Sequence, residues 1–169
     1  HKDWRTCPWY DFAVLAKMCM VAKFMVEGVF MDLMEQLRGR AAANPQKVAF
    51  FEGTNPKMME TVGELAKAGL AECFLVGDGA ALRQVAQEAG VDLANVTVVD
   101  ITDEEANEAF AQRFEATPDC PFKAKAVRRR AKRPMDRALM MQRIGDTDIT
   151  FGGIDCSTGD VIVGGQTII

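Results

Sequence analysis

Residues 48–56 read VAFFEGTNP, and residues 73–79 read CFLVGDG. Each stretch begins with four apolar residues in a row and ends in a turn sequence of glycine and small polar residues. A strand that is apolar at every position is buried on both faces, which is typical of a parallel sheet covered by helices. The two stretches therefore predict strands at 48–51 and 73–76, each followed by a turn that leads into a helix.

The segments that follow these strands have helical features. Thr54 or Asn55 can cap a helix that has Pro56 at its first position and ends at Gly69. Further elements are predicted as helices over 32–43, 80–89 and from 102 or 103 to 114, and as strands over 96–99 and 149–151. Buried strands that alternate with helices indicate an α/β fold of three layers, with a mostly parallel sheet flanked by helices.

Ligands in such sheets meet the carboxyl ends of the strands, so the turns at 52–54 and 77–79 lie on the candidate functional edge. We interpret Glu52 and Gly53 as the turn that exposes the end of the first strand, and we do not expect Glu52 to be catalytic. The segment Gly77-Asp78-Gly79 lacks the third glycine of a dinucleotide fingerprint. The sequence thus gives no support for NAD binding.

Composition sets further limits on the function. The chain has 169 residues, 49% hydrophobic and 26% charged, with a net charge of −4 that disfavours a nucleic-acid-binding protein. Its longest apolar candidate, residues 12–26, contains two lysines and is too short to span a membrane. Five widely spaced cysteines without a CxxC pair predict reduced thiols in a cytoplasmic protein, with neither a disulfide framework nor a metal site.

The first thirty residues differ in composition from the rest of the chain. All Trp, Tyr and His of the sequence lie within residues 1–10, and residues 27–31 can be back-translated to a purine-rich ribosome-binding stretch before a start codon. We therefore expect residues 1–30 to be a non-native upstream extension. The alternative is a native amphipathic helix with apolar residues Phe12, Leu15, Met18, Cys19 and Ala22 on one face.

Basic residues are concentrated in one region. Residues 123–143 hold nine basic residues and one acidic residue, and Pro134 divides the region into two predicted helices. The basic face has three possible roles: a solvated helix face, a site for the phosphates of a ligand, or a nucleic-acid patch. The last is disfavoured because no aromatic residues are interleaved and the surrounding sequence is acidic.

The segment after the fourth strand reads GGIDCSTGD at 152–160. Two glycines followed by Ser157 and Thr158 before an apolar helix form a strand, loop and helix start, whose backbone N–H groups and hydroxyls can hold a phosphate. One of the two hydroxyls can instead cap the helix. Cys156 lacks a histidine partner after residue 31, so a covalent cysteine mechanism is not expected.

Several segments together resemble the phosphate acetyl/butyryltransferase (phosphotransacetylase) family. They are the opening over 31–54, residues 69–78 against the family's G-L-A-x-x-x-L-V-G, residues 133–148 against D-P-x-x-x-A-x-M-M-x-x-L-G-x-x-D, and residues 153–160 against G-A-x-H-S-T-A-D. The resemblance covers 31–169, which we take as the N-terminal part of such a domain. Members are about twice as long, and their other principal catalytic residues lie in a second half beyond the matched region.

The resemblance implies phosphate-binding residues and also shows departures from the family pattern. Gly153, Ser157 and Thr158 are the implied contacts in the loop, and Arg113 is one position off a further family arginine. Cys156 stands where the family commonly has histidine, and Val163 stands where it has a substrate-binding arginine. No catalytic residue is assigned in this chain.

The resemblance implies transfer of an acetyl or other short acyl group between coenzyme A and inorganic phosphate, without a metal or other cofactor. The expected partners are acyl-CoA and phosphate or acyl phosphate, and a homodimer is expected at full length. Because the chain stops at Ile169 inside an apolar helical pattern, we expect a truncated chain that is inactive alone. The loss of arginine at 163 keeps open an alternative, a non-catalytic regulatory or assembly module of the same fold.

Overall fold

The computed structural model describes residues 32–169. The predicted upstream extension over 1–30 lies outside the described residues. Residues 32–43 form a helix, as predicted. Ala41–Ile169 form a compact unit that contains the sheet and the helices that cover it.

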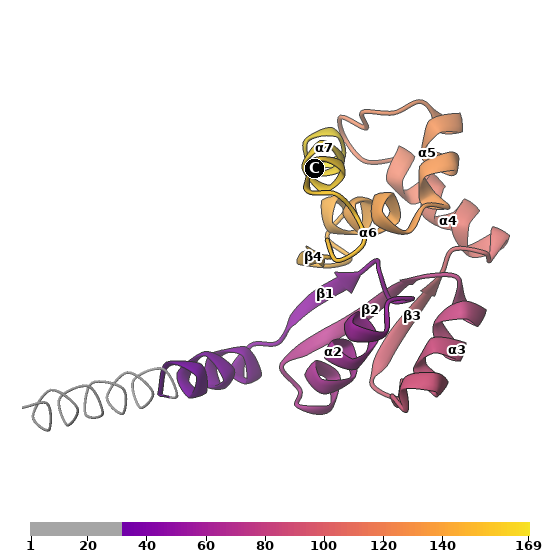
Figure 1. The fold of residues 1–169 in the computed structure, drawn as a ribbon. Coiled ribbons are helices and arrows are strands. Elements are labelled where there is room, and N and C mark those ends of the chain that lie inside the picture. The colour runs from indigo at the N-terminus through magenta and orange to yellow at the C-terminus, as the bar shows by residue number, and fades with distance from the viewer. Residues whose placement is uncertain (1–31) are drawn as a thin grey trace, which may run out of the picture. The chain divides into compact units, whose positions relative to one another are not determined.

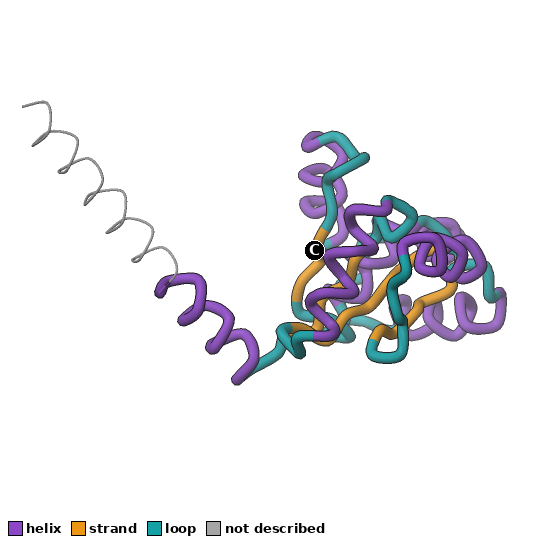
Figure 2. Tube along the Cα trace, turned by 60° about the horizontal axis from the view of Figure 1, so that its bottom comes forward, coloured by secondary structure: helices purple, strands orange, loops and turns teal. Residues whose placement is uncertain are grey.

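Four parallel strands form the sheet, in the order β3-β2-β1-β4. Their bounds are Gln46–Phe50 for β1, Ala71–Gly77 for β2, Val96–Asp100 for β3 and Ile149–Phe151 for β4. The strands run side by side between the helices (Figure 2). β1 lies in the interior of the sheet because Val48 pairs with Cys73 of β2 on one side and with Ile149 of β4 on the other.

Helices cover both faces of this sheet and confirm the three-layer α/β fold. They are α2 (Pro56–Lys67), α3 (Gly79–Ala89), α4 (Glu104–Glu115), α5 (Ala124–Ala131), α6 (Pro134–Arg143) and α7 (Thr158–Ile168). α2 and α3 pack on one face, and α4, α5 and α6 gather on the other, with α7 beside α6 (Figure 1). None of the helices in the described region is long and apolar enough to cross a membrane.

Successive residues of β1 point into two separate cores, which explains its continuous apolar sequence. Ala49 and Phe51 face the core under α4 to α7, where Phe110, Phe114 and Met140 lie. Phe50 faces the opposite core under α2 and α3. Since side chains alternate along a strand, the buried part of a strand between two helical layers is apolar at successive positions.

Local capping fixes where α2 begins and where the chain leaves it. Asn55, and not Thr54, is the N-cap: its side chain accepts a hydrogen bond from the N–H of Lys57 at 3.0 Å, and Pro56 follows at the first helical position. The helix ends at Lys67, and Gly69 then takes a left-handed conformation with φ of +63°.

The strand order creates a crevice between β1 and β4. From β1 the chain moves outward to β2 and β3, and it then crosses back to place β4 on the other side of β1. At such a switch point the connections leave the sheet in opposite directions, so the carboxyl ends of the two strands border an opening in which ligands bind. The loops that follow Phe50 and Phe151 therefore meet at this edge.

Candidate functional site

Glu52, directly after β1, is bound by the loop that follows β4. Its carboxylate accepts hydrogen bonds from four successive backbone N–H groups, those of Gly153 (2.7 Å), Ile154 (2.7 Å), Asp155 (3.1 Å) and Cys156 (2.8 Å). The side chain is nearly inaccessible, with 5% of its surface exposed. The loop is thus an anion-binding nest whose anion is a carboxylate of the same chain.

The nest keeps this buried carboxylate ionised. Burial alone would raise the pKa of Glu52, but the N–H groups of Ile154, Cys156 and Gly153 bind the charged form and lower its pKa to about 2. Because the N–H of Gly153 already donates a hydrogen bond to Glu52, a phosphate could bind this N–H only by displacing the Glu52 carboxylate. A phosphate contact by Gly153 stays a prediction.

Two glycines allow the loop to take this shape. A Cβ on Gly152 would lie 2.2 Å from an atom of the Phe51 ring, so only glycine fits where the loop passes over β1. Gly153 has a φ of +111°, a conformation that side-chain-bearing residues rarely adopt. A second link joins the same two loops, since the amide of Asn55 donates to the carboxylate of Asp155 at 3.1 Å.

Ser157 caps α7 and lies at the opening. Its hydroxyl accepts a hydrogen bond from the N–H of Asp160 at 3.2 Å and donates one to the Asp160 carboxylate at 2.7 Å. Thr158 is the first residue of α7 and is exposed. The capping role expected as one alternative is confirmed for Ser157, and phosphate contacts by Ser157 and Thr158 stay predictions.

A cleft of about 670 Å³ lies between the loops, α6 and α7. Its lining residues are Phe51, Glu52, Arg130, Arg133, Pro134, Met135, Asp136, Cys156, Ser157, Gly159, Asp160, Val163, Gly164 and Thr167. The cations in this lining, Arg130 and Arg133, both approach the buried carboxylate of Asp136, at 3.2 Å and 3.4 Å. The cleft thus brings arginines and a hydroxyl to the carboxyl ends of the strands.

Arg113 lies elsewhere. It is in α4, it is not part of the lining of this cleft, and its guanidinium pairs with Asp146 at 2.6 Å. This hydrogen bond raises the pKa of Arg113. The structure therefore does not bring Arg113 together with Ser157 and Thr158, and its role in substrate binding remains a prediction.

Cys156 is unsuited to act as a nucleophile in this state. Burial and the neighbouring Glu52 carboxylate both raise the pKa of its thiol, so the thiol stays protonated at neutral pH. The expectation from the sequence that no covalent cysteine mechanism operates stays a prediction.

Part of the basic region is neutralised by α4. Arg128 binds Glu108 at 2.6 Å and Glu115 at 2.5 Å, and Lys132 binds Glu104 at 2.5 Å. The two predicted helices that meet near Pro134 are confirmed as α5 and α6. The basic residues of this region that remain directed into the cleft are Arg130 and Arg133.

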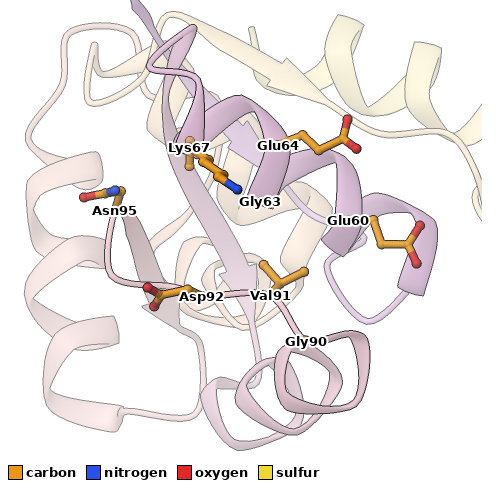
Figure 3. Close-up of a pocket in the computed structure, with 9 residues that line it drawn as sticks. Glu60, Gly63, Glu64, Lys67, Gly90, Val91, Asp92 and Asn95 are labelled. Carbon is orange, nitrogen blue, oxygen red and sulfur yellow. The ribbon is translucent and has the colours of Figure 1, made fainter.

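A second cleft, of about 540 Å³, lies at the opposite end of the sheet. Glu60, Glu64 and Lys67 of α2 border it, together with Asp92 and Asn95 from the segment that precedes β3 (Figure 3). Three carboxylates and one ammonium group border it, a negative balance that disfavours a phosphate ligand. The cleft between the loops is the better candidate site because it lies at the carboxyl ends of the strands and contains arginines.

The role of Glu52 was not predicted from the sequence. Two features of the sequence together could have predicted this role. An acidic residue, Glu52, directly follows a buried strand, and a loop with two glycines follows another strand, at residues 152–153. A carboxylate at the buried end of a strand needs donors, and such a loop can supply them. Which loop does so depends on the strand order.

The sequence model of the family described as phosphate acetyl/butaryl transferase matches residues 32–169. Among curated proteins, the chain is 26% identical over 140 residues to a phosphate acetyltransferase of Clostridium acetobutylicum, covering 82% of this chain and 42% of that protein. It is 24% identical over 133 residues to a phosphate acetyltransferase of Acetivibrio thermocellus, covering 78% and 40%. The chain thus spans about two fifths of the length of these relatives.

Solved structures show the same fold. The chain superimposes on the EutD phosphotransacetylase from Staphylococcus aureus with a TM-score of 0.71 at 19% identity, covering 82% of this chain and 42% of that one. A phosphotransacetylase from Streptococcus pyogenes gives a TM-score of 0.68 at 20% identity, with the same coverage. At these identities the likeness concerns the fold alone.

Proposed function

The chain belongs to the phosphate acetyl/butaryl transferase family, and we propose that the whole protein transfers an acetyl or other short acyl group between coenzyme A and inorganic phosphate. The observation that carries this proposal is the cleft at the carboxyl ends of β1 and β4, where Ser157 and two arginines surround a space open to an anion. The curated relatives are named phosphate acetyltransferases.

In the proposed reaction the coenzyme A thiolate attacks the carbonyl carbon of an acyl phosphate. The carbon–sulfur bond forms as the carbon–oxygen bond to phosphate breaks, and phosphate leaves with the electron pair; the reverse direction forms acyl phosphate from acyl-CoA. This chain's part is to hold the phosphate with guanidinium and hydroxyl donors. Coenzyme A enters as a substrate, so no separate cofactor is proposed.

Glu52 acts in this proposal through the loop. By holding the N–H groups of residues 153–156, it fixes the position of Ser157 at the start of α7. The residues that handle the thiol proton and the developing oxyanion are not assigned in this chain. We therefore expect residues 32–169 alone to be inactive, and we propose that the whole protein is a cytoplasmic homodimer.

A second candidate function rests on Val163. An apolar residue stands at this position of α7, where the family resemblance implies a substrate-binding arginine, and its side chain is 62% exposed beside the cleft. A protein that had lost its phosphate site would serve as a non-catalytic regulatory or assembly module.

The two candidates are distinguished by one assay on the protein expressed from its complete reading frame. Release of free coenzyme A from acetyl-CoA, propionyl-CoA and butyryl-CoA is measured in the presence of inorganic phosphate, with sulfate as the matched control. Release that depends on phosphate supports the acyltransferase. If none of the donors gives phosphate-dependent release, the enzyme proposal is wrong and the module is favoured.

A further inference from the structure

One buried carboxylate pairs with both arginines that line the cleft between the loops, α6 and α7. Asp136 lies in the first turn of α6 and is 2% exposed. Its Oδ2 atom lies 3.2 Å from a guanidinium nitrogen of Arg130 and 3.4 Å from one of Arg133. Both cations that the described residues contribute to this lining therefore share a single carboxylate oxygen.

The two arginines differ in how firmly they are held. The side chain of Arg130 is 23% exposed, and its guanidinium carbon lies 4.3 Å from the centre of the Phe122 ring. The side chain of Arg133 is 66% exposed, and its contact with Asp136 is longer than the about 2.7–2.9 Å of a charge-assisted hydrogen bond. Arg130 is thus fixed, whereas Arg133 can exchange Asp136 for another anion without a change in the fold.

The other carboxylates of the lining have partners of their own. Glu52 accepts hydrogen bonds from four backbone N–H groups, and Asp160 accepts one from the Ser157 hydroxyl. Asp136 is therefore the carboxylate that neutralises the arginines of the cleft. A phosphate group that enters the cleft has to compete with Asp136 for the guanidinium of Arg133.

We propose that Asp136 is an internal competitor that limits how strongly this cleft binds a phosphate group. It pairs with Arg133 in the free protein and gives up this arginine when a phosphate oxyanion binds. A guanidinium recognises the same oxyanion in inorganic phosphate and in the phosphate groups of coenzyme A, so the test includes both. The inference rests on the proposed acyl transfer and names the residue that sets the substrate affinity of its cleft.

A competitor and a purely structural residue predict opposite results when the charge of Asp136 is removed. A carboxylate in the first turn of a helix also stabilises that helix, and loss of this role alone would lower stability without tightening ligand binding. Loss of a competitor tightens binding, because the phosphate no longer has to displace a carboxylate and is no longer repelled by it. A gain in affinity is therefore the decisive result.

The test compares Asp136→Asn with the wild type, each expressed from the complete reading frame. Titration calorimetry is carried out with inorganic phosphate and, separately, with coenzyme A. We expect Asp136→Asn to lower the Kd by about tenfold or more for at least one of the two, and the ligand that shows the gain identifies the source of the phosphate group. Unchanged or weaker binding of both ligands overturns the proposal.

Glu104→Gln is the matched control, since it removes the same charge from a carboxylate that pairs with Lys132 outside the cleft. We expect it to leave both Kd values unchanged, and an equal gain in this variant would overturn the proposal in favour of a general charge effect. Arg133→Gln introduced into Asp136→Asn should abolish most of the gain. A gain that persists in this double variant does not arise at Arg133 and also overturns the proposal.

Loss of a buried ion-pair partner can also unfold the protein, so thermal unfolding provides a second measurement. A ligand raises Tm by more when it binds more tightly. At the same ligand concentration, the ligand that shows the gain should therefore raise the Tm of Asp136→Asn by more than that of the wild type, or restore folding to a variant that is unfolded alone. An equal or smaller effect of both ligands overturns the proposal.

These binding measurements need no turnover and so remain distinct from the proposed function. If the wild type shows no phosphate-dependent release of coenzyme A but Asp136→Asn tightens binding through Arg133, the proposed function is wrong and the competitor role stands. If the wild type transfers acyl groups and Asp136→Asn tightens the binding of neither ligand, the function stands and this inference is wrong.

Discussion

Glu52 shows how one buried charge can determine the shape of a loop that starts a hundred residues later in the chain. The carboxylate accepts hydrogen bonds from the four backbone N–H groups of residues 153–156, and it is itself nearly inaccessible, with 5% of the residue exposed. Removing the carboxylate and the N–H groups from water costs free energy, and this cost is offset only while the two bind each other. Removing the charge therefore affects the loop, the cap of α7 and the cleft together.

Replacing Glu52 by glutamine tests this dependence. We expect Glu52→Gln to lower the free energy of unfolding by about 2–4 kcal/mol, because the amide NH₂ group would face N–H donors and leave some of them unpaired. Chemical denaturation at neutral pH measures the change. Glu60→Gln is the matched control on an exposed face of α2, where the change should stay within about 0.5 kcal/mol. Equal losses in the two variants would contradict the role of the loop.

The same residue predicts a dependence of stability on pH. The folded protein lowers the pKa of Glu52 from its ordinary value of 4.5 to about 2, so the ionised form stabilises the fold above pH 4.5. As the pH falls from 4.5 to 2, the unfolded chain takes up this proton first, and a contribution of about 3 kcal/mol is lost. Denaturation curves across this range should show a steeper loss for the wild type than for Glu52→Gln. Parallel pH profiles of the two proteins would contradict this prediction.

At the scale of elements, the start of α7 combines a structural and a proposed binding role in Ser157. The hydroxyl satisfies the N–H of Asp160 and faces the cleft. An N-cap side chain replaced by alanine costs about 1 kcal/mol, whereas aspartate and asparagine cap as well as serine does. The two roles can therefore be separated by the choice of substitution.

We expect Ser157→Ala to lower the free energy of unfolding by about 1 kcal/mol and Ser157→Asn to leave it nearly unchanged. Ser157→Asp also caps a helix, but its carboxylate would lie against that of Asp160 and lose the hydrogen bond that Ser157 donates, so we expect some loss of stability together with a phosphate KM raised by about tenfold or more. Thermal unfolding and phosphate-dependent release of coenzyme A measure the two effects. A Ser157→Asp variant with normal phosphate KM would show that Ser157 is only a helix cap.

The elements themselves were largely predictable from the sequence because two-sided burial leaves a continuous apolar run. The strands at 48–51, 73–76 and 96–99 were found for this reason, and their bounds differ from the structure by up to two residues. Gln46 and Lys47 belong to β1 although they are polar, since strand pairing uses the backbone and does not require an apolar side chain. Helix starts were found where a cap and a proline coincide, as at Pro56.

The site was less predictable because it depends on the arrangement of the whole molecule. The local pattern of Ser157 and Thr158 predicts the helix start that they form, and their phosphate contacts stay predictions. Glu52 and Gly153 are 101 residues apart and meet only because β4 pairs with β1. In the basic region, too, the sequence does not show which arginines are buried. Arg137 is buried, with its guanidinium 3.4 Å from the centre of the Phe110 ring, which no local pattern distinguishes from the exposed arginines beside it.

At the scale of the whole molecule, β4 leaves an apolar edge. Ile149 and Phe151 are 42% and 51% exposed, although they pair with Val48 and Phe50, which belong to the core under α2 and α3. Within the described residues β4 is the last strand on its side of the sheet, so its outer backbone groups have no partner strand. An apolar edge strand of this kind promotes association between chains.

We therefore expect residues 32–169, expressed alone, to self-associate at micromolar concentrations, with Ile149→Lys reducing the association because a charged side chain blocks edge pairing. Thr97→Lys is the matched control, since it adds the same charge to an exposed position of β3, the strand at the opposite edge. Sedimentation velocity and light scattering on the three proteins measure the effect. If Thr97→Lys reduces association as much as Ile149→Lys does, general charge repulsion explains it and the apolar edge of β4 does not. A monodisperse wild-type fragment would show that the exposed edge of β4 does not cause association.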